Sequence, residues 1–494
     1  MAEQRRHREV SFEQQMSDAE ALMWNVEKDP WLNPSGAMVT LFDQPVDFDG
    51  FKRRVAVAVA DTARLRERVQ PGLGRLAPPR WVPDAEFALE YHVRHIALAG
   101  QGTTRELLDL CTRLYEDPFD RTRPLWVFYV IDGLADGRGA LFSKMHHTIA
   151  DGKAAIRLSE RYMEFERETE LPDEVDLAAI VAAAAAEAAQ SDEIPDEHTE
   201  EPPSSRPGAE LIGFASGLVK RQLDLTRKVA GEVAGWGADV GRPVELGEAA
   251  FDNAKGIYDN LGVGEEEQPG SPLWAERSRH RQLEALHVPL DRAKAAGKAL
   301  GGTVNDVFVA GAVAGAIRYH SKRGIALEDL HVSFVISTRK KGSKGGNAFT
   351  PTPMRVPAAD MPIDELFELL REQMGAKKNA VASSSAGTLG SLARVANLMP
   401  TSVVTRLARE RSGTLDFATS NLRGSPIPIY VSGAKVEQNV ILGPVAGTAF
   451  NLTTLSNENS LDMGLFVDPV AVEDPADLRD CLLEAYAELL GLGG

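Results

Sequence analysis

The run of seven residues from His146 to Gly152, which reads His-His-Thr-Ile-Ala-Asp-Gly, constrains the fold of this chain more than any other feature. It lies where an apolar strand pattern, Gly139 to Met145, gives way to a helical pattern, Lys153 to Phe165. Alternating apolar residues predict a strand, and apolar residues three and four apart predict a helix. A junction between two such elements presents polar side chains at the edge of a core, and so this run is the first candidate site.

The two histidines of the run are expected to point to opposite sides of the strand. Successive side chains of an extended segment alternate between its two faces. His147 should therefore share a face with Met145, and His146 should share the other face with Lys144. One histidine can then act as a base while its neighbour anchors the strand from behind.

Two other interpretations of the run stay open at this point. Both histidines can be core or loop residues, and Asp151 can be the N-cap of the following helix, a frequent position for aspartate. Histidine and aspartate are also zinc ligands, but the sequence has no HExxH run, no cysteine cluster and no third ligand at a regular spacing. No metal site is predicted.

Length and charge limit the class of protein. The 494 residues are enough for two core-forming units of roughly 200 residues each. The sequence has no secretory signal at its start and no apolar run of the roughly 18 residues that a membrane-spanning helix needs. A cytoplasmic protein is expected. The net charge of -18 disfavours a nucleic-acid partner and broad adhesion to anionic lipid, so any contact with the inner membrane or a lipid droplet should be peripheral and local.

The two cysteines, Cys111 and Cys481, follow no metal or redox spacing. Both lie in apolar helical patterns, and we expect them to be buried as small hydrophobic residues.

The chain divides into residues 1–187, a connecting region 188–270, and residues 271–494. The connecting region combines an acidic, proline-rich stretch, Ser191 to Pro207, with an amphipathic helical pattern from Leu211 to Val240. Both outer units alternate helical and strand patterns. The predicted helices are Asp18 to Glu27, Phe51 to Ala60, a helix through Glu106 and Leu114 that either Thr103 or Thr104 caps, Leu290 to Ala299, Val304 to Tyr319 and Pro475 to Leu490. The predicted strands are Ala37 to Phe42, Leu125 to Ile131, Ala140 to Met145, His331 to Ile336, Phe417 to Thr419, Ile427 to Val431 and Leu461 to Phe466.

Several further motifs stand in a fixed order around the histidine run: Tyr91 to His95, Asp117 to Trp126, Thr303 to Asp306, Gly346-Asn347 and Ser420 to Gly424. Together they cover nearly the whole chain, which resembles the bacterial wax ester synthase/diacylglycerol acyltransferase family. That family is a branch of the CoA-dependent acyltransferases, which include chloramphenicol acetyltransferase and the condensation domains of nonribosomal peptide synthetases. The HHxxxDG motif alone marks only the superfamily, whereas its combination with Pro-Leu-Trp and Asn-Asp is specific.

The resemblance implies an α/β fold of two chloramphenicol-acetyltransferase-like subdomains, with mixed sheets flanked by helices and a channel between the halves. It implies transfer of a long-chain fatty acyl group from acyl-CoA to the hydroxyl of a diacylglycerol or a long-chain alcohol, giving triacylglycerol or wax ester. Acyl-CoA would be a co-substrate, and no further cofactor is expected. Since the sequence has no GxSxG run and no cysteine beside a histidine, we expect direct transfer without an acyl-enzyme.

The resemblance also assigns roles to the histidine run. His147 corresponds to the catalytic general base of the family, a role that suits an imidazole because its ordinary pKa is near 6.5. His146 is interpreted as a packing or hydrogen-bonding support. Asp151 would orient the loop, by pairing with an arginine from elsewhere in the chain, and Gly152 would permit a tight turn.

Asn305 is a candidate donor to the oxyanion of the tetrahedral intermediate, because its amide can donate and it belongs to the Asn-Asp motif. The same stretch also fits a helix start, with Thr303 as N-cap and Asp306 completing a capping box. Candidate substrate-binding residues from the other motifs are Pro124, Leu125, Trp126, Asn347, Ser420 and Asn421. For the Pro-Leu-Trp segment, packing in the core is an equal alternative.

Two departures from the family pattern leave the acceptor open. A string similar to SNVPGP is common in the family, but here the sequence from Ser420 to Pro426 reads SNLRGSP. A Ser-Tyr pair of the family is replaced by Ser456-Asn457. Two rival functions therefore remain: a condensation-type acyltransferase acting on another alcohol or an amine, and a lipid-binding homologue of low activity.

Overall fold

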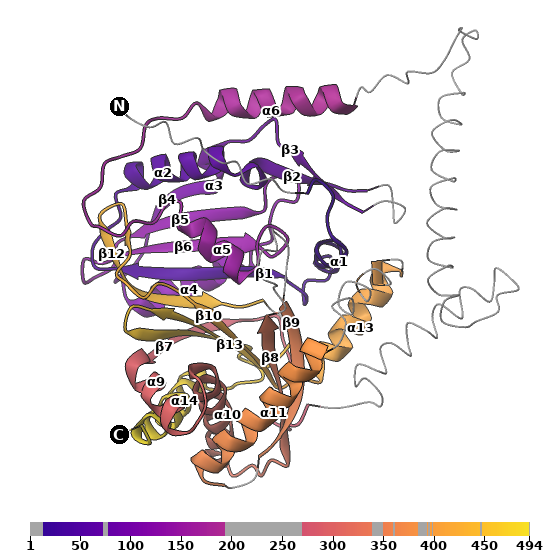
Figure 1. Ribbon diagram of the computed structural model, residues 1–494, viewed down its shortest axis with the longest axis vertical. Coiled ribbons are helices and arrows are strands. Elements are labelled where there is room, and N and C mark those ends of the chain that lie inside the picture. Colours follow the sequence, from indigo (N-terminus) through magenta and orange to yellow (C-terminus); the bar gives the residue numbers. More distant parts are fainter. Residues whose placement is uncertain are drawn as a thin grey trace, which may run out of the picture.

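The computed structural model describes residues 13–72, 78–192, 269–337, 349–358, 361–383, 393, 396–397, 399–444 and 447–493. Two six-stranded mixed sheets lie one beneath the other, with helices above the upper sheet and below the lower one (Figure 1). A small two-stranded sheet, β2 (Glu67–Gln70) with β3 (Arg80–Pro83), lies beside the first. This is the two-lobed α/β architecture that the sequence predicts.

The sheet of the first lobe has the strand order β11-β12-β1-β6-β5-β4. The antiparallel pair β1 and β6 forms its centre, and β4 joins β5 in parallel. Its strands are β1 (Ser35–Phe42), β4 (Val93–Ala97), β5 (Trp126–Asp132), β6 (Gly139–His146), β11 (Tyr430–Val431) and β12 (Ala434–Leu442).

The sheet of the second lobe has the order β7-β14-β13-β10-β8-β9. Strand β10 is parallel to both of its neighbours, and the other pairs are antiparallel. Its strands are β7 (Gln282–Pro289), β8 (Asp329–Ser337), β9 (Phe349–Pro357), β10 (Phe417–Arg423), β13 (Phe450–Asn457) and β14 (Ser460–Val467).

Strands β11 and β12 cross from the second half of the sequence into the first lobe. Strand β12 pairs with β1 along its length, and Thr40 Oγ1 donates to Asn439 Oδ1 at 3.0 Å across 399 positions of sequence. The pattern of the sequence alone does not predict this crossing, because the periodicity of a strand does not identify the strand with which it pairs.

The helices of the first lobe are α1 (Asp18–Val26), α2 (Phe48–Asp61), the 3-10 helix η1 (Ala63–Arg66), α3 (Leu89–His92), α4 (Thr104–Glu116), α5 (Gly152–Ser159) and α6 (Leu177–Asp192). Those of the second lobe are α9 (Leu290–Ala299), α10 (Val304–Lys322), α11 (Ile363–Ser383), α13 (Thr401–Gly413) and α14 (Pro475–Gly491). Within the described residues, no single helix is both long and apolar enough to cross a membrane.

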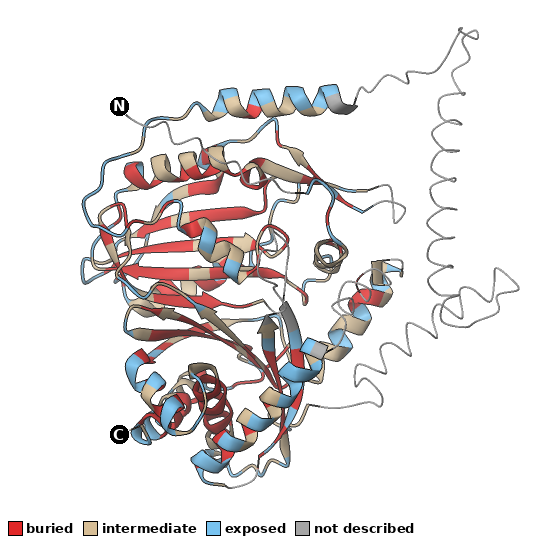
Figure 2. Ribbon diagram, viewed as in Figure 1, coloured by how far each residue is buried: buried red, intermediate tan, exposed pale blue. Residues whose placement is uncertain are grey.

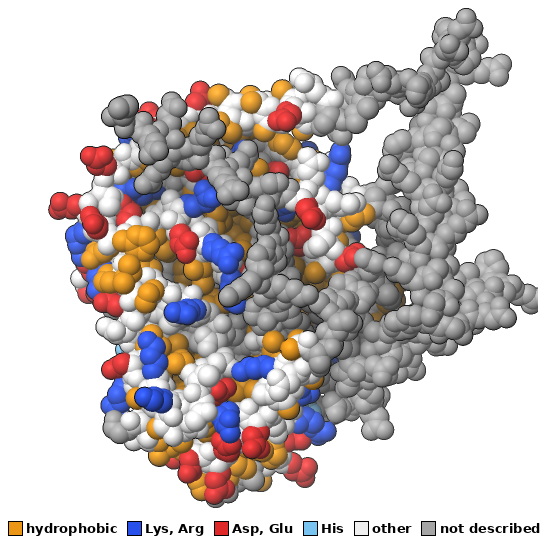
Figure 3. Space-filling view, viewed as in Figure 1, with side chains coloured by type: hydrophobic (Ala, Val, Ile, Leu, Met, Phe, Trp, Pro, Cys, Tyr) orange, Lys and Arg blue, Asp and Glu red, His pale blue; other side chains and the backbone are white. Residues whose placement is uncertain are grey.

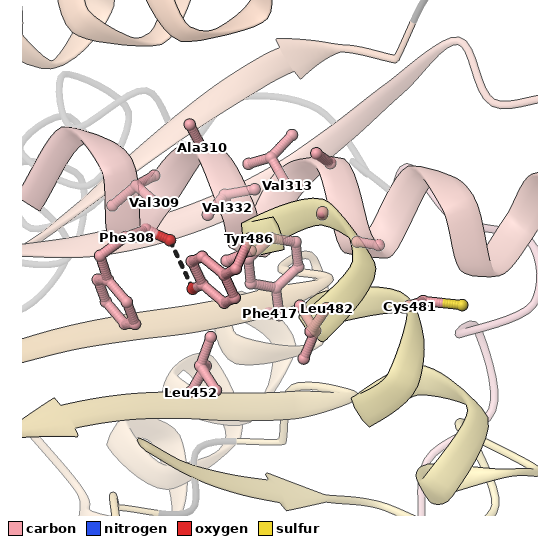
Figure 4. Packing of buried hydrophobic residues seen from close by; sticks show 14 of the residues in the cluster. Phe308, Val309, Ala310, Val313, Val332, Phe417, Leu452, Cys481, Leu482 and Tyr486 are labelled. Carbon is pink, nitrogen blue, oxygen red and sulfur yellow. Dashed lines mark hydrogen bonds between the residues drawn. The ribbon is translucent and has the colours of Figure 1, made fainter. Parts of the chain in front are cut away.

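Burial follows these layers, with buried residues along the sheets and the inner helix faces (Figure 2). In the second lobe α10 and α14 pack closely, because Gly311 and Gly315 leave room for Tyr486 and Leu482. The Tyr486 hydroxyl donates to the carbonyl of Phe308 at 2.8 Å (Figure 4). A further cluster joins the lobes through α4 and both sheets and includes Val39, Leu107, Cys111, Phe142, Leu283 and Phe466.

Most predicted elements are confirmed, and both cysteines are fully buried as expected. Two elements are shorter than predicted. The helix after the histidine run ends at Ser159, and the strand predicted for Ile427 to Val431 holds only Tyr430 and Val431. In both places the backbone turns away to form an isolated bridge between Glu164 and Tyr430. The pattern from Leu211 to Val240, and the acidic stretch beyond Asp192, lie outside the described residues.

Candidate active site

The histidine run forms a tight turn at the end of β6. The Ile149 N–H donates to the carbonyl of His146 at 2.9 Å and closes the turn. Its flanks are held by the neighbouring strands, since His146 N–H donates to Leu125 O at 3.0 Å and His147 N–H donates to Pro34 O at 3.1 Å. His147 is therefore carried on a backbone that is hydrogen-bonded on both sides.

The side chains of the pair lie on opposite faces of the sheet, as the alternation predicts. His147 is half-buried, and its Nε2 is 3.5 Å from the position that a Cβ on Gly36 of β1 would occupy. His146 is fully buried on the other face, where Lys144 is also buried.

The hydrogen bonds of the His146 ring fix its protonation pattern. Its Nδ1 accepts the backbone N–H of Thr148 at 3.1 Å and lies 2.7 Å from the Thr148 hydroxyl. A backbone N–H can only donate, so Nδ1 carries no proton and the neutral ring holds its proton on Nε2. That nitrogen faces Glu27 Oε2 at 3.5 Å.

A buried group of charges stands behind the strand around His146. Burial alone would raise the pKa of Glu27, but the contact with His146 and the charges of Arg121 and Lys144 hold that pKa below its ordinary value. For Lys144, burial lowers the pKa to about 8, against the opposing effect of Asp117 and Glu27. Its ammonium donates to the carbonyls of Leu114 and Asp117 at the end of α4. Cations are stabilised at this end of a helix.

Asp151 and Gly152 start helix α5 behind the turn. Asp151 is the N-cap, and its Oδ1 accepts the Ala154 N–H at 2.8 Å. Gly152 lies against β10 of the second lobe, where a Cβ would come within 2.7 Å of Leu422 Cδ2. The absence of a side chain at Gly152 thus lets the two lobes meet beside the turn.

The structure joins Asn305 and Asn421, which the sequence places in separate motifs. Asn421 Nδ2 donates to Asn305 Oδ1 at 3.2 Å, so the amide group of Asn305 is directed away from that contact, toward the Met374 sulfur at 4.0 Å. Asn421 directly precedes the Leu422 that packs on Gly152. Asp306 has the capping role, because its carboxylate accepts from both the N–H and the hydroxyl of Thr303 at 2.8 Å.

The Pro-Leu-Trp segment lies in the core of the first lobe. Pro124, Leu125 and Trp126 are buried, and Trp126 Nε1 donates to Leu65 O at 2.8 Å. This burial favours the packing interpretation over a substrate contact. Trp126 also stacks on His92, whose burial lowers its pKa to about 4, and that pKa keeps the His92 ring neutral.

Ser420 lies on β10 opposite Thr453 of β13 and is half-buried. Asn347 lies outside the described residues. The sequence does not predict that two further residues, Glu27 and Lys144, belong to the site. Neither carries a local signal, because each reaches its partners through contacts between distant segments.

Two cavities lie away from the histidine turn. One, of about 340 Å³, is lined by His287, Glu437 and Asn457 among others. The other, of about 450 Å³, lies around Arg54, Arg167 and Ser432. The candidate site consists of the turn and its contact with β10.

The fold is of the two-lobed α/β class, and a histidine on a hydrogen-bonded turn lies next to the line where the two lobes meet. The family model of the wax ester synthase/diacylglycerol acyltransferase catalytic domain matches residues 16–308, and that of the C-terminal domain of the same family matches residues 345–490. This chain belongs to that family.

Relatives and solved structures agree with this placement. A Mycobacterium tuberculosis (strain H37Rv) protein assigned as a diacylglycerol O-acyltransferase is 27% identical over 492 residues, 97% of this chain and 92% of that protein. Another from the same strain, assigned as diacylglycerol O-acyltransferase tgs2, is 30% identical over 401 residues, 79% of each chain.

Among solved structures, the wax ester synthase/diacylglycerol acyltransferase from Marinobacter aquaeolei VT8 superposes with a TM-score of 0.62 at 20% identity, covering 97% of this chain and 100% of that one. The first condensation domain of the CDA synthetase gives 0.53 at 17% identity, covering 98% and 97%. These two similarities establish the fold.

Proposed function

We propose that this acyltransferase moves a long-chain fatty acyl group from acyl-CoA to the hydroxyl of a diacylglycerol or a long-chain alcohol, with His147 as general base. The observation that carries the proposal is the HHTIADG turn: it holds a half-buried imidazole beside the contact between the lobes, in a chain of this family. The mycobacterial relatives assigned as diacylglycerol O-acyltransferases support the acceptor class.

The proposed reaction is a direct transfer. The imidazole of His147 takes the proton of the acceptor hydroxyl as its oxygen attacks the thioester carbonyl carbon. The tetrahedral intermediate then collapses, the carbon–sulfur bond breaks, and the CoA thiolate takes the proton back from His147. Such general-base assistance is worth about 10²- to 10⁴-fold in rate.

The proposed oxyanion donor is the amide of Asn305. Its orientation is fixed by the hydrogen bond from Asn421, and its carbonyl oxygen is thereby occupied. An oriented donor is worth about 10²- to 10³-fold when it faces the developing negative charge. Ser420, on the same strand as Asn421, is proposed to line the acceptor side.

We further propose that the protein is cytoplasmic, needs no cofactor beyond acyl-CoA as co-substrate, and meets the inner membrane or lipid droplets only peripherally. Exposed Phe165 and Ile427 support a local apolar contact, because the bridge between Glu164 and Tyr430 brings their segments together. Hydrophobic side chains gather over the β11–β12 region on the face in Figure 3.

The test is an acceptor panel in which the purified chain receives a long-chain acyl-CoA with diacylglycerol, with hexadecanol, or with other alcohols and amines. Release of CoA thiol is measured against the His147→Ala variant as blank. We expect release with diacylglycerol or hexadecanol. Release only with another alcohol or an amine would instead favour the condensation-type function. Saturable lipid binding without thiol release from either protein would favour the lipid-binding homologue.

A further inference from the structure

We propose that Glu27 is a positioning residue of the acyl-transfer site: its carboxylate orients the ring of His146, and that ring clamps the turn that carries His147. The inference rests on the proposed role of His147. It assigns a function to a carboxylate that lies 119 positions away from His146 in the sequence.

Within the turn, the ring of His146 holds the residue that follows His147. Thr148 follows His147 directly, and its N–H and hydroxyl both bind Nδ1 of His146. The His146 ring therefore fixes the backbone immediately beyond His147. If the ring rotated, the Thr148 N–H would lose its acceptor inside the protein, which is costly for a buried donor.

The ring of His146 is itself held by a second contact, at Nε2. With Nδ1 occupied as an acceptor, the Nε2–H of His146 needs an acceptor in a fully buried site. The Oε2 of Glu27, 3.5 Å away, is the carboxylate oxygen that faces it. The Lys144 ammonium on the same face is held by the carbonyls of α4 and by the Phe119 ring, 4.6 Å from its centre.

Glu27 is also fixed in place by its own contacts. It is the C-cap of α1, and its side chain is 12% exposed. Arg121 Nη1 lies 3.0 Å from the same Oε2 while its Nη2 donates to Trp24 O at 2.8 Å, with the guanidinium 3.4 Å above the Trp24 ring. Arg121 thus ties the carboxylate to the helix that carries it.

Helix α1 is in turn attached to the second half of the chain. Asn397 Nδ2 donates to Asp18 O at 2.8 Å, and Asn25 Nδ2 donates to Asn397 Oδ1 at 3.4 Å. The ring of His146 is therefore linked through one helix to a residue from the other half of the sequence. A shift of that segment would reach the turn of His147 through Glu27.

The experiment compares Glu27→Leu and Glu27→Gln in the full chain. The matched controls are Asp61→Leu and Asp61→Asn. Asp61 is the last residue of α2 in the same lobe, and its side chain, 18% exposed, pairs with Arg161 at 3.3 Å. The readouts are kcat and KM for thiol release, and the ¹⁵N spectrum of histidine-labelled protein, in which the His146 signals are assigned by their loss in His146→Gln.

We expect the wild-type His146 signals to show a bare Nδ1 and a protonated Nε2. In Glu27→Leu the buried Nε2–H loses its acceptor, so these signals should shift and kcat should fall by about tenfold, with KM changed less than about twofold. Glu27→Gln keeps an acceptor oxygen, and kcat should fall only about threefold. The Asp61 variants should keep the wild-type kcat and His146 signals.

A kcat for Glu27→Leu equal to that of Asp61→Leu, or unchanged His146 signals, would overturn the proposal. If Glu27→Leu fails to fold, Glu27→Gln decides: an unchanged Nε2 signal together with a wild-type kcat overturns it. Failure of the proposed function looks different, since the wild-type protein would then release no thiol with any acceptor while the ¹⁵N signals still test the contact of Glu27 with His146.

Discussion

At the end of β6, two adjacent histidines lie on opposite faces of the strand and in opposite surroundings. Behind the strand, His146 is fully buried among Glu27, Arg121 and Lys144, and both of its ring nitrogens face partners. In front, His147 is half-buried beside Gly36. The difference teaches how surroundings can divide the proposed roles of two adjacent histidines: the closed face would support the turn, and the open face would serve proton transfer.

The largest expected effect is that of His147→Ala. Loss of the base should reduce kcat by about 10²- to 10⁴-fold, while the free energy of unfolding changes little because this face is only half-buried. Steady-state thiol release and urea unfolding measure the two quantities. A folded variant that retains more than a few per cent of the wild-type rate would remove His147 from the base role.

For His146→Ala we expect a large loss of stability and a smaller loss of rate than for His147→Ala. It leaves a cavity and takes the ring away from Thr148 and Glu27, so the free energy of unfolding should fall by about 2 to 4 kcal/mol. The rate should fall about tenfold, much less than for His147→Ala. If a folded His146→Ala enzyme were as inactive as the His147 variant, the division between the two faces would be wrong.

Lys144, on the closed face with His146, should make the stability of the protein depend on pH. Its pKa is about 8 in the folded protein, where burial lowers it from 10.5. Below pH 8 the amine is charged in both states, and the folded state bears the cost of burying that charge. Between pH 8 and 10.5 only the unfolded chain keeps the proton, so this group makes stability rise with pH across that window.

Lys144→Met removes this dependence. The free energy of unfolding of the wild type should therefore gain about 2 to 3 kcal/mol relative to the variant between pH 8 and 10.5. Urea unfolding of both proteins at several pH values measures the difference. A constant difference across this window would show that the buried amine does not titrate there.

The smallest expected effect is that of Gly152→Ala at the contact between the lobes. The new methyl group meets only the end of the Leu422 side chain, so kcat should fall by about threefold. The double variant Gly152→Ala, Leu422→Ala should restore the rate, while Leu422→Ala alone stays close to wild type. Additive losses in the double variant would show that the two residues act independently.

The sequence predicts local features of the site well and distant ones poorly. The alternation of the strand separates His146 from His147, and the helix-start chemistry places Asp151 and the pair Thr303 and Asp306 as caps. These features depend on residues within four positions of one another, where backbone geometry is decisive.

The remaining features depend on tertiary contacts. Glu27 at His146, Asn421 at Asn305 and the crossing of β12 into the first lobe each join residues more than 100 positions apart. No periodicity encodes such a pairing. The burial of Trp126 likewise follows from its position on an inner strand of the sheet, and the motif alone left that open.

The crossing of β12 bears on how this chain is made. Strand β1 lies between β6 and β12. During synthesis, residues near position 40 are therefore made long before their pairing partners near position 439. At the usual pace of synthesis the ribosome needs about 20 to 80 s to add these 399 residues. During that time one edge of β1 is open, and an open edge invites pairing with other chains. The order of the strands therefore leaves the nascent first lobe in need of protection until β12 has been made.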